Sequence, residues 1–249
     1  MQPTLSYTIW FSQRTGSTLL CHALESTGIA GHPGEHLHEN TLQELYRSYK
    51  ARTPAELRSR IWEVASTPNG VLGLKHAIFE PAFTALLEAF RQIDGHDGTR
   101  SGIWANTFPN VRHIFMTRRN KVRLAVSWWK AIQSQEWHRL HGEPPQHGDI
   151  ADRYSAEAID HLVAESVMRE AGIQEFFTQG HIVPFTVTYE DFVSRYEQTV
   201  LDILWWLGLE FTNGTVAPPA YERLSDAISD DWVERFRRDK QAGWQNRGW

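Results

Sequence analysis

The chain has 249 residues, of which 41% are hydrophobic and 22% charged; these ordinary globular values suit one large α/β domain or two small ones. Its formal net charge of −5 excludes the general basic surface of a nucleic-acid-binding protein, and the single cysteine, Cys21, excludes an internal disulfide framework. The sequence has no apolar run near the ~20 residues of a membrane span and no signal-peptide pattern at its N-terminus, so we predict a cytoplasmic protein.

Short apolar segments rich in β-branched or aromatic residues predict buried strands. They are Leu5–Phe11, Val71–Leu74, Val111–Met116 and Ile182–Thr188. Amphipathic segments between and after them predict helices at Ser17–Thr27, Glu56–Ala65, Pro81–Gln92, Lys121–Gln135, Ala156–Thr178 and Asp191–Leu207. Thr53 and Pro54 form a start signal for the second of these helices, and Thr41 with Glu44 predicts a further short helix.

The alternation of strands and helices predicts a mostly parallel sheet with helices on both faces. No repeat or linker divides the chain, so we predict a single domain over residues 1–249. Ligands of such sheets bind beyond the carboxyl ends of the strands. The segment His138–Asp152, with its Pro-Pro pair and no periodicity, is interpreted either as a functional lid or as a disordered loop.

The residues that follow the first strand predict an anion site at a helix start. Gly16 lets the backbone approach an anion, while the hydroxyls of Thr15, Ser17 and Thr18 and the charge of Arg14 add donors. The loop lacks the lysine and the second glycine of a nucleoside-triphosphatase loop, so it suits a nucleotide's 5'-phosphate group better than a triphosphate with its metal. The alternative is an ordinary strand–turn–helix corner with capping hydroxyls.

A second basic site follows the third strand. Arg118 and Arg119 stand at its carboxyl end, and Ser127 lies eight residues after Arg119 on the next helix. A guanidinium and this hydroxyl could close on one phosphate, because the guanidinium fork matches phosphate oxygens. The alternative is solvated surface charge, although cations at a helix N-terminus are electrostatically unfavourable. Two phosphate sites at neighbouring strand ends suggest a nucleotide phosphorylated at two places.

Several motifs together resemble the bacterial trehalose 2-sulfotransferase family, within the wider superfamily of sulfotransferases. They are Ser12–Leu20, Gly28–Glu35, Thr117–Val122 with Ala125–Ser127, and the Tyr-Glu-Asp sequence within Thr188–Phe192. The resemblance spans roughly residues 5–210 and implies a P-loop-like three-layer α/β/α fold, with a central mostly parallel sheet flanked by helices. It also implies a homodimer and an acceptor hydroxyl on a trehalose-like carbohydrate or glycoconjugate.

The resemblance further implies a co-substrate, 3'-phosphoadenosine 5'-phosphosulfate, bound without a metal and released as 3'-phosphoadenosine 5'-phosphate. The phosphate-loop residues would hold the 5'-phosphosulfate, Arg119 and Ser127 would hold the 3'-phosphate, and Tyr189 of the Tyr-Glu-Asp motif would contact the donor.

A general base must take the proton of the acceptor hydroxyl. The family places this base at Glu35, and His76 is the rival candidate. Lys75 precedes His76 at the end of a strand, so the two side chains point to opposite faces, and we favour Lys75 as a cation near the leaving oxygen.

Other interpretations stay open. His32, His36 and His38 surround Glu35 and could ligate zinc, although histidines in a Gly/Pro loop are more often surface residues, and we predict no metal. A P-loop-type small-molecule kinase and a nucleotide-binding protein without catalysis are the alternative functions.

Overall fold

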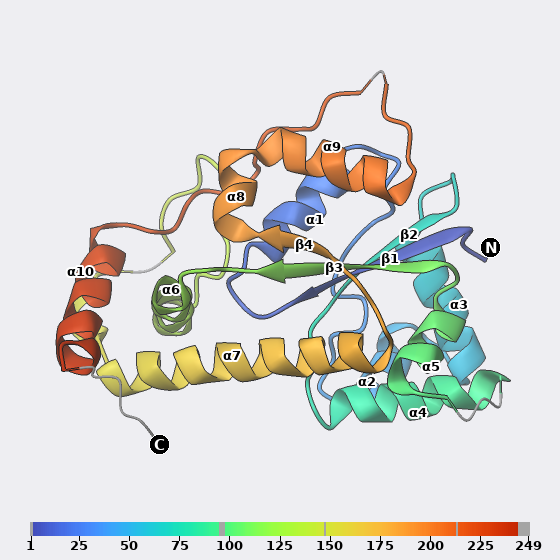
Figure 1. Ribbon diagram of the computed structural model, residues 1–249, viewed down its shortest axis with the longest axis horizontal. Coiled ribbons are helices and arrows are strands. Elements are labelled where there is room, and N and C mark those ends of the chain that lie inside the picture. The colour runs from blue at the N-terminus through green and yellow to red at the C-terminus, as the bar shows by residue number, and fades with distance from the viewer. Residues whose placement is uncertain (1, 95–97, 147, 213, 244–249) are drawn as a thin grey trace.

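A four-stranded parallel sheet forms the centre of the computed structural model, which describes residues 2–94, 98–146, 148–212 and 214–243 (Figure 1). Its strands are β1 (Leu5–Phe11), β2 (Val71–His76), β3 (Val111–Thr117) and β4 (Phe185–Thr188). The helices are α1 (Ser17–Glu25), α2 (Leu42–Ser48), α3 (Pro54–Ala65), α4 (Ala82–Asp94), α5 (Arg100–Thr107), α6 (Lys121–Ser134), α7 (Ala156–Gln179), α8 (Tyr189–Ser194), α9 (Tyr196–Leu207) and α10 (Ala227–Phe236). A 3₁₀ turn (Ala151–Arg153) and a π turn (Arg237–Gln241) complete the described elements.

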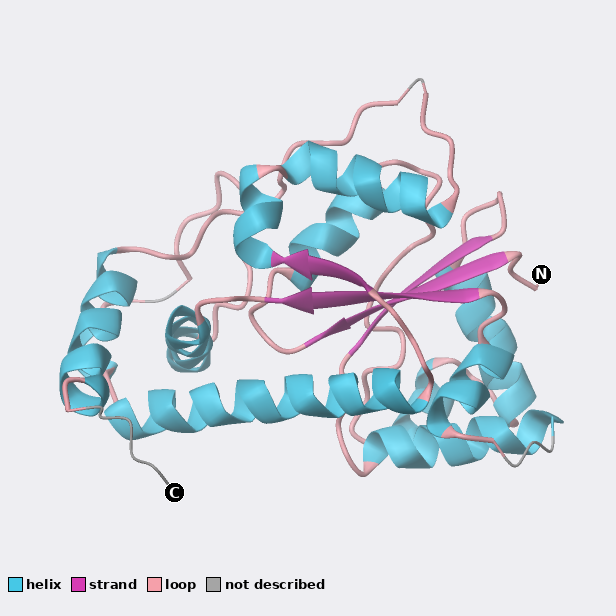
Figure 2. Cartoon of the chain, in the orientation of Figure 1, coloured by secondary structure: helices cyan, strands magenta, loops and turns pink. Residues whose placement is uncertain are grey.

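The strands are ordered β2-β1-β3-β4, and each neighbouring pair is parallel (Figure 2). Helices α1 and α9 pack on one face through an apolar cluster that includes Ile9 and Leu20, and helices α3, α4, α5 and α7 pack on the other through a cluster around Trp10. The side chains of Ile9 and Trp10 reach opposite faces because neighbouring residues of a strand alternate. The predicted fold class, a P-loop-like three-layer α/β/α architecture with a parallel sheet, is confirmed.

A third apolar cluster lies beyond the sheet, where α6, α7 and α10 meet around Trp232. Helix α10 is held to α6 by Lys130, whose Nζ lies 2.6 Å from the Asp226 carboxylate and donates to the Leu224 carbonyl. This contact brings the C-terminal part of the described chain beside the carboxyl ends of the strands (Figure 1).

The observed elements differ from the predicted ones in a few places. Strand β2 continues to His76, so Lys75 and His76 lie within the strand. Strand β4 begins only at Phe185, after Pro184, which has no N–H to donate to a neighbouring strand. The single helix predicted over Asp191–Leu207 is divided into α8 and α9 at Arg195, which has non-helical backbone angles. None of the described helices is long and apolar enough to cross a membrane.

Candidate active site

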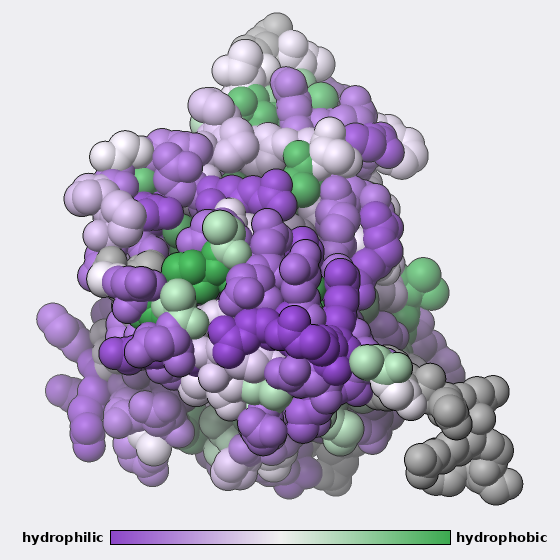
Figure 3. Space-filling view, turned by 90° about the vertical axis from the view of Figure 1, so that its left-hand side faces the viewer, coloured by the Kyte–Doolittle hydropathy of each residue, from purple (hydrophilic) through white to green (hydrophobic). Residues whose placement is uncertain are grey.

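A cavity of about 580 Å³ lies at the carboxyl ends of β1, β3 and β4, where parallel sheets bind their ligands. Its walls come from the phosphate loop, one side of α6 along its length with the residues that follow it, the Tyr-Glu-Asp segment, and residues between 219 and 225. Figure 3 looks onto this end of the molecule and shows a mostly hydrophilic surface that surrounds smaller apolar patches. The cavity therefore brings the phosphate loop together with Arg118 and Ser127 of the second predicted basic site.

The phosphate loop turns sharply into α1. Arg14 (φ 62°) and Gly16 (φ 85°) both have left-handed backbone angles, and a Cβ at position 16 would lie 2.6 Å from Cδ2 of Tyr189. Glycine is thus required both by its backbone angle and by the closeness of the Tyr189 ring. Gly16, Ser17 and Thr18 line the cavity, whereas the Thr15 hydroxyl is buried and donates to the Ser12 carbonyl at 2.8 Å. Thr15 therefore fixes the loop conformation.

Two guanidinium groups lie at the cavity. Arg14 donates from Nε to Oγ of Ser127 at 3.0 Å, and Arg118 stacks on the ring of Tyr189 at 4.6 Å. Burial, followed by the charge of Arg118, lowers the pKa of Arg14 to about 10, and burial also lowers the pKa of Arg118. Two partly desolvated cations side by side favour a bound anion, which would offset both the burial and the repulsion.

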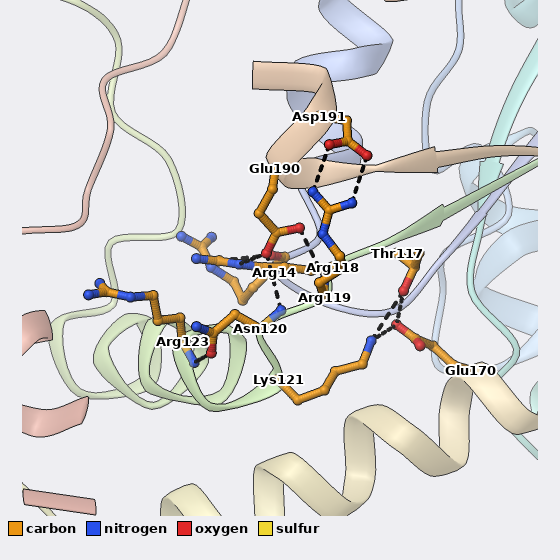
Figure 4. Close-up of polar contacts among 10 residues, drawn as sticks. All are labelled: Arg14, Thr117, Arg118, Arg119, Asn120, Lys121, Arg123, Glu170, Glu190 and Asp191. Atoms are coloured by element: carbon orange, nitrogen blue, oxygen red, sulfur yellow. Dashed lines mark hydrogen bonds and ion pairs between the residues drawn. The ribbon is translucent and has the colours of Figure 1, made fainter. Parts of the chain in front are cut away.

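Arg119 lies elsewhere. Its guanidinium makes a two-pronged pair with the Asp191 carboxylate at 2.8 and 2.6 Å, and its side chain is 60% exposed (Figure 4). The residues that line the cavity include Arg118 and Ser127 but not Arg119. In the structure Arg119 pairs with Asp191, whereas Arg14 and Arg118 line the cavity together with Ser127. The pairing of Arg119 with Ser127 on a phosphate stays a prediction.

The Tyr-Glu-Asp motif holds the start of α6. Glu190 accepts hydrogen bonds from the backbone N–H groups of Arg119 (3.0 Å) and Asn120 (3.1 Å) (Figure 4). Burial alone would raise the pKa of Glu190, but hydrogen bonds from backbone N–H groups, together with the charge of Arg118, lower it overall. Asp191 pairs with Arg119, and Tyr189 lies at the cavity. The residues that follow β4 are thus bound to the basic turn that follows β3.

Lys75 connects Glu35 to the phosphate loop. Its Nζ lies 2.7 Å from Oε1 of Glu35 and donates to Oγ1 of Thr18 at 2.9 Å, and its side chain is only 6% exposed. The other Glu35 oxygen lies 3.5 Å from Nδ1 of His38. The carboxylate, the ammonium group and the loop hydroxyl thus form one continuous polar chain, which begins beside the cavity at Thr18.

His76 lies on the opposite face of β2, as the alternation predicts. Its ring packs among those of Trp10, Phe83 and Trp104, with centroids 5.3 to 5.8 Å apart. Burial, followed by the charge of His38, lowers the pKa of His76 to about 3. Of the two candidates for the base, Glu35 is the one that contacts Lys75.

This burial of His76 predicts an acid-dependent loss of stability. The pKa of His76 is near 6.5 in the unfolded chain and about 3 in the folded protein. Below pH 6.5 the unfolded chain therefore binds a proton that the folded protein does not, so the free energy of unfolding falls as the pH falls from 6.5 toward 3. At pH 5 the free energy of unfolding is expected to be about 2 kcal/mol lower than at pH 7.5 through His76 alone. Urea unfolding at both pH values measures the difference.

The variant His76→Phe should lose this part of the pH dependence, and His161→Gln, at an exposed position of α7, should keep it. A His76→Phe protein with the pH dependence of the unaltered chain would contradict the prediction.

The histidines around Glu35 have separate partners. His32 pairs with Glu25 at 3.0 Å, and His36 bonds the His32 carbonyl. Across the described residues, no group of three or more His, Cys, Asp or Glu side chains is arranged to hold a metal ion.

A model of the Stf0 sulphotransferase family matches residues 6–239 of the sequence. The chain belongs to this family. It is 31% identical to the trehalose 2-sulfotransferase of Mycolicibacterium smegmatis, covering 95% of this chain and 96% of that one, and 28% identical to that of Mycobacterium tuberculosis, covering 94% of each. As a member of the Stf0 sulphotransferase family, it is an enzyme that transfers a sulfonate group.

Two solved sulfotransferase structures also align with this Stf0 sulphotransferase. The sulfotransferase from Alicyclobacillus acidocaldarius matches with a TM-score of 0.47 and 13% identity over 96% of this chain and 93% of that one. The sulfotransferase domain from the curacin biosynthetic pathway matches with a TM-score of 0.45 and 14% identity over 96% and 98%.

This Stf0 sulphotransferase has site residues that the sequence did not single out. His138 lines the cavity, with Nε2 3.4 Å from Oγ1 of Thr18 and its ring 5.4 Å from that of Tyr221. Leu140 pairs with Tyr221 in an isolated antiparallel bridge, so the first part of the segment 138–152 lies against residues 220–222. Such a pairing across the cavity supports the lid interpretation; residue 147 of this segment lies outside the described residues. The only sequence signal was the irregular composition of this stretch.

Proposed function

We propose that the enzyme transfers sulfonate from 3'-phosphoadenosine 5'-phosphosulfate to a hydroxyl of a small carbohydrate or glycoconjugate, with Glu35 as general base. The observation that carries this proposal is the chain Glu35–Lys75–Thr18, which joins a carboxylate to a phosphate loop at the edge of a cavity with two arginines. The relatives' names, trehalose 2-sulfotransferase, support a trehalose-like acceptor.

The donor would occupy the cavity. The N-terminal N–H groups of α1, with Arg14, Ser17 and Thr18, suit the 5'-phosphosulfate, because a helix start and a guanidinium both stabilise anions. For the 3'-phosphate we propose Arg118 with Ser127, in place of the pairing of Arg119 with Ser127 that the spacing suggests. Tyr189 would act through its stacking on Arg118.

In the proposed reaction, the acceptor oxygen forms a bond to sulfur while the bond between sulfur and the bridging phosphate oxygen breaks. Glu35 takes the proton of the acceptor hydroxyl, and the Lys75 ammonium group, which touches both Glu35 and Thr18, stabilises the negative charge that develops on the bridging oxygen. The products are the sulfate ester, 3'-phosphoadenosine 5'-phosphate and protonated Glu35, so charge and atoms balance.

Calorimetric titration with 3'-phosphoadenosine 5'-phosphate in the presence of a chelator tests the donor, with ATP–magnesium as the comparison. We expect binding of the bisphosphate without metal and much weaker binding of ATP–magnesium. The reverse order would overturn the proposed donor, and binding of the bisphosphate without turnover on any sugar would overturn the proposed acceptor class. The metal-free site, the single domain over residues 1–249, the homodimer and the cytoplasmic location stay predictions.

A further inference from the structure

His138 lies at the cavity that the donor would occupy, beside the start of α1. Its side chain lines this cavity, and its Nε2 lies 3.4 Å from Oγ1 of Thr18, the second residue of α1. The free N–H groups at the start of a helix attract anions, and Thr18 belongs to that start. An anion bound at the phosphate loop would therefore lie beside the His138 imidazole.

The hydrogen bonds of Thr18 indicate which ring nitrogen of His138 carries the proton when no anion is bound. Lys75 donates from Nζ to Oγ1 of Thr18 at 2.9 Å, and because an ammonium group only donates, the Thr18 hydroxyl keeps its own hydrogen to give. We assign Nε2 of His138 as the acceptor, which places the proton of the neutral ring on Nδ1. At 3.4 Å this contact is long, so an anion oxygen can replace it at little cost.

The groups around His138 hold it neutral. The charged and titratable side chains that act on it come from the phosphate loop, α1, the segment before α2, β2 and residues 219–225; they are Arg14, His22, Glu35, Lys75 and Tyr221. The side chain is exposed at the cavity, yet partial burial, followed by the charges of Arg14 and Lys75, lowers the pKa of His138 to about 4. Glu35 acts in the opposite direction and is outweighed. The imidazole is therefore uncharged at neutral pH in the absence of a bound anion.

A bound phosphate would reverse this balance. Its negative charge opposes the charges of Arg14 and Lys75 and favours the imidazolium, so the pKa of His138 rises when the anion binds. The donor's 5'-phosphate gains a further negative charge when the sulfonate leaves it. A cationic N–H donor at this place, in addition to Lys75, stabilises that charge.

We propose that His138 takes up a proton from the solvent when an anion binds at the phosphate loop, and that the imidazolium donates from Nε2 to an oxygen of the 5'-phosphate. The inference rests on the proposed function for the identity of the anion. It makes His138 a binding residue for the donor and for the bisphosphate product, with the stronger contact to the product, whose 5'-phosphate carries the larger charge.

Nuclear magnetic resonance of the histidine side chains measures the pKa of His138 directly, and the signal that is absent from the variant His138→Gln identifies it. The probes are 3'-phosphoadenosine 5'-phosphate and inorganic sulfate, of which sulfate has no titration of its own near neutral pH. Without a probe the ring should stay neutral down to about pH 5, and with either probe at saturation it should become charged below about pH 6.5. A pKa of His138 that both anions leave unchanged overturns the proposal.

The nucleotide affinity should carry the same signature. If the bound imidazole regains its ordinary pKa of about 6.5, the affinity for the bisphosphate rises about fourfold more between pH 8 and pH 6 in the unaltered protein than in His138→Gln. The nucleotide's own phosphates also titrate in this range, but equally with both proteins, so the ratio of the two affinities isolates His138. Glutamine can donate a hydrogen bond without titrating, and a merely structural role of the side chain would leave this ratio independent of pH.

His141→Gln is the matched control. His141 lies on the same segment as His138, pairs with Glu222 at 2.9 Å and is not among the residues that line the cavity. This variant should keep the pH-dependent part of the affinity. A ratio that does not change with pH in His138→Gln, or a pH dependence that disappears in His141→Gln, would contradict the role of His138.

This inference and the proposed donor can fail separately. If sulfate raises the pKa of His138 and the bisphosphate does not bind, the donor assignment fails and His138 stands as a residue of an anion site. If the bisphosphate binds and the pKa of His138 stays unchanged, the donor stands and the role of His138 is refuted. If neither anion binds, both are refuted.

Discussion

Replacing Glu35 by glutamine is expected to lower turnover by about 10²- to 10⁴-fold while the affinity for 3'-phosphoadenosine 5'-phosphate changes little. Glutamine keeps the size of the side chain and can still accept a hydrogen bond from Lys75, whose Nζ lies 2.7 Å from the carboxylate. It cannot take a proton from the acceptor hydroxyl. The loss should therefore fall on kcat rather than on nucleotide binding.

Turnover is measured by release of the bisphosphate product, and binding by calorimetry on the same preparation. Glu25→Gln is the matched control, because Glu25 pairs with His32 on the surface and has no place in the proposed reaction. Unchanged turnover in Glu35→Gln would remove Glu35 as the base. A parallel loss of nucleotide binding would instead indicate that the Glu35–Lys75 pair mainly shapes the phosphate loop.

Arg118→Ala is expected to weaken binding of 3'-phosphoadenosine 5'-phosphate by about 10- to 100-fold, the usual effect of removing a charged hydrogen-bonding partner. Arg119→Ala should change the affinity only a few-fold, because this guanidinium is exposed and held by Asp191. The pair of variants is closely matched, since the two residues are adjacent and carry the same charge.

The affinity for adenosine 5'-phosphate, which lacks the 3'-phosphate, tests which phosphate Arg118 holds. We expect Arg118→Ala to affect this nucleotide much less than the bisphosphate. If Arg119→Ala has the larger effect on the bisphosphate, the eight-residue spacing to Ser127 is the better guide, and Arg119 must leave Asp191 when the nucleotide binds.

The sequence predicted the main elements of the fold because their patterns are strong. Strand β1 has the predicted bounds, and the capping threonine of α3 accepts the expected hydrogen bond from Glu56. Helix α5 was missed because its eight residues show no clear amphipathic pattern, and α10 because its start depends on a reciprocal pairing of Asp226 with Ser229. The break between α8 and α9 at Arg195 could not be predicted, because the sequence has no glycine or proline there.

Less of the candidate site could be predicted. The position of the phosphate loop directly after a strand predicted its role. Alternation along β2 puts Lys75 and His76 on opposite faces of the sheet, so only one of the two side chains can face the phosphate loop. The direction of Arg118 and Arg119 depends on the turn into α6, which Glu190 fixes from the start of α8, about 70 residues away in the sequence. His138 lies beside Tyr221 because Leu140 pairs with Tyr221 in an isolated bridge. The sequence could not predict this contact, since neither residue belongs to a motif.

The wall formed by residues 219–225 has a consequence for synthesis of the chain on the ribosome. The phosphate loop is present within the first twenty residues, but the cavity around it also needs Tyr221 and Arg223, and the contact of Lys130 with Asp226 holds that wall in place. A nascent chain emerges from its N-terminus, so it acquires the loop much earlier than this wall. Translation arrested before residue 219 therefore yields a chain that lacks this wall of the cavity, and we expect such a chain to bind the proposed nucleotide more weakly.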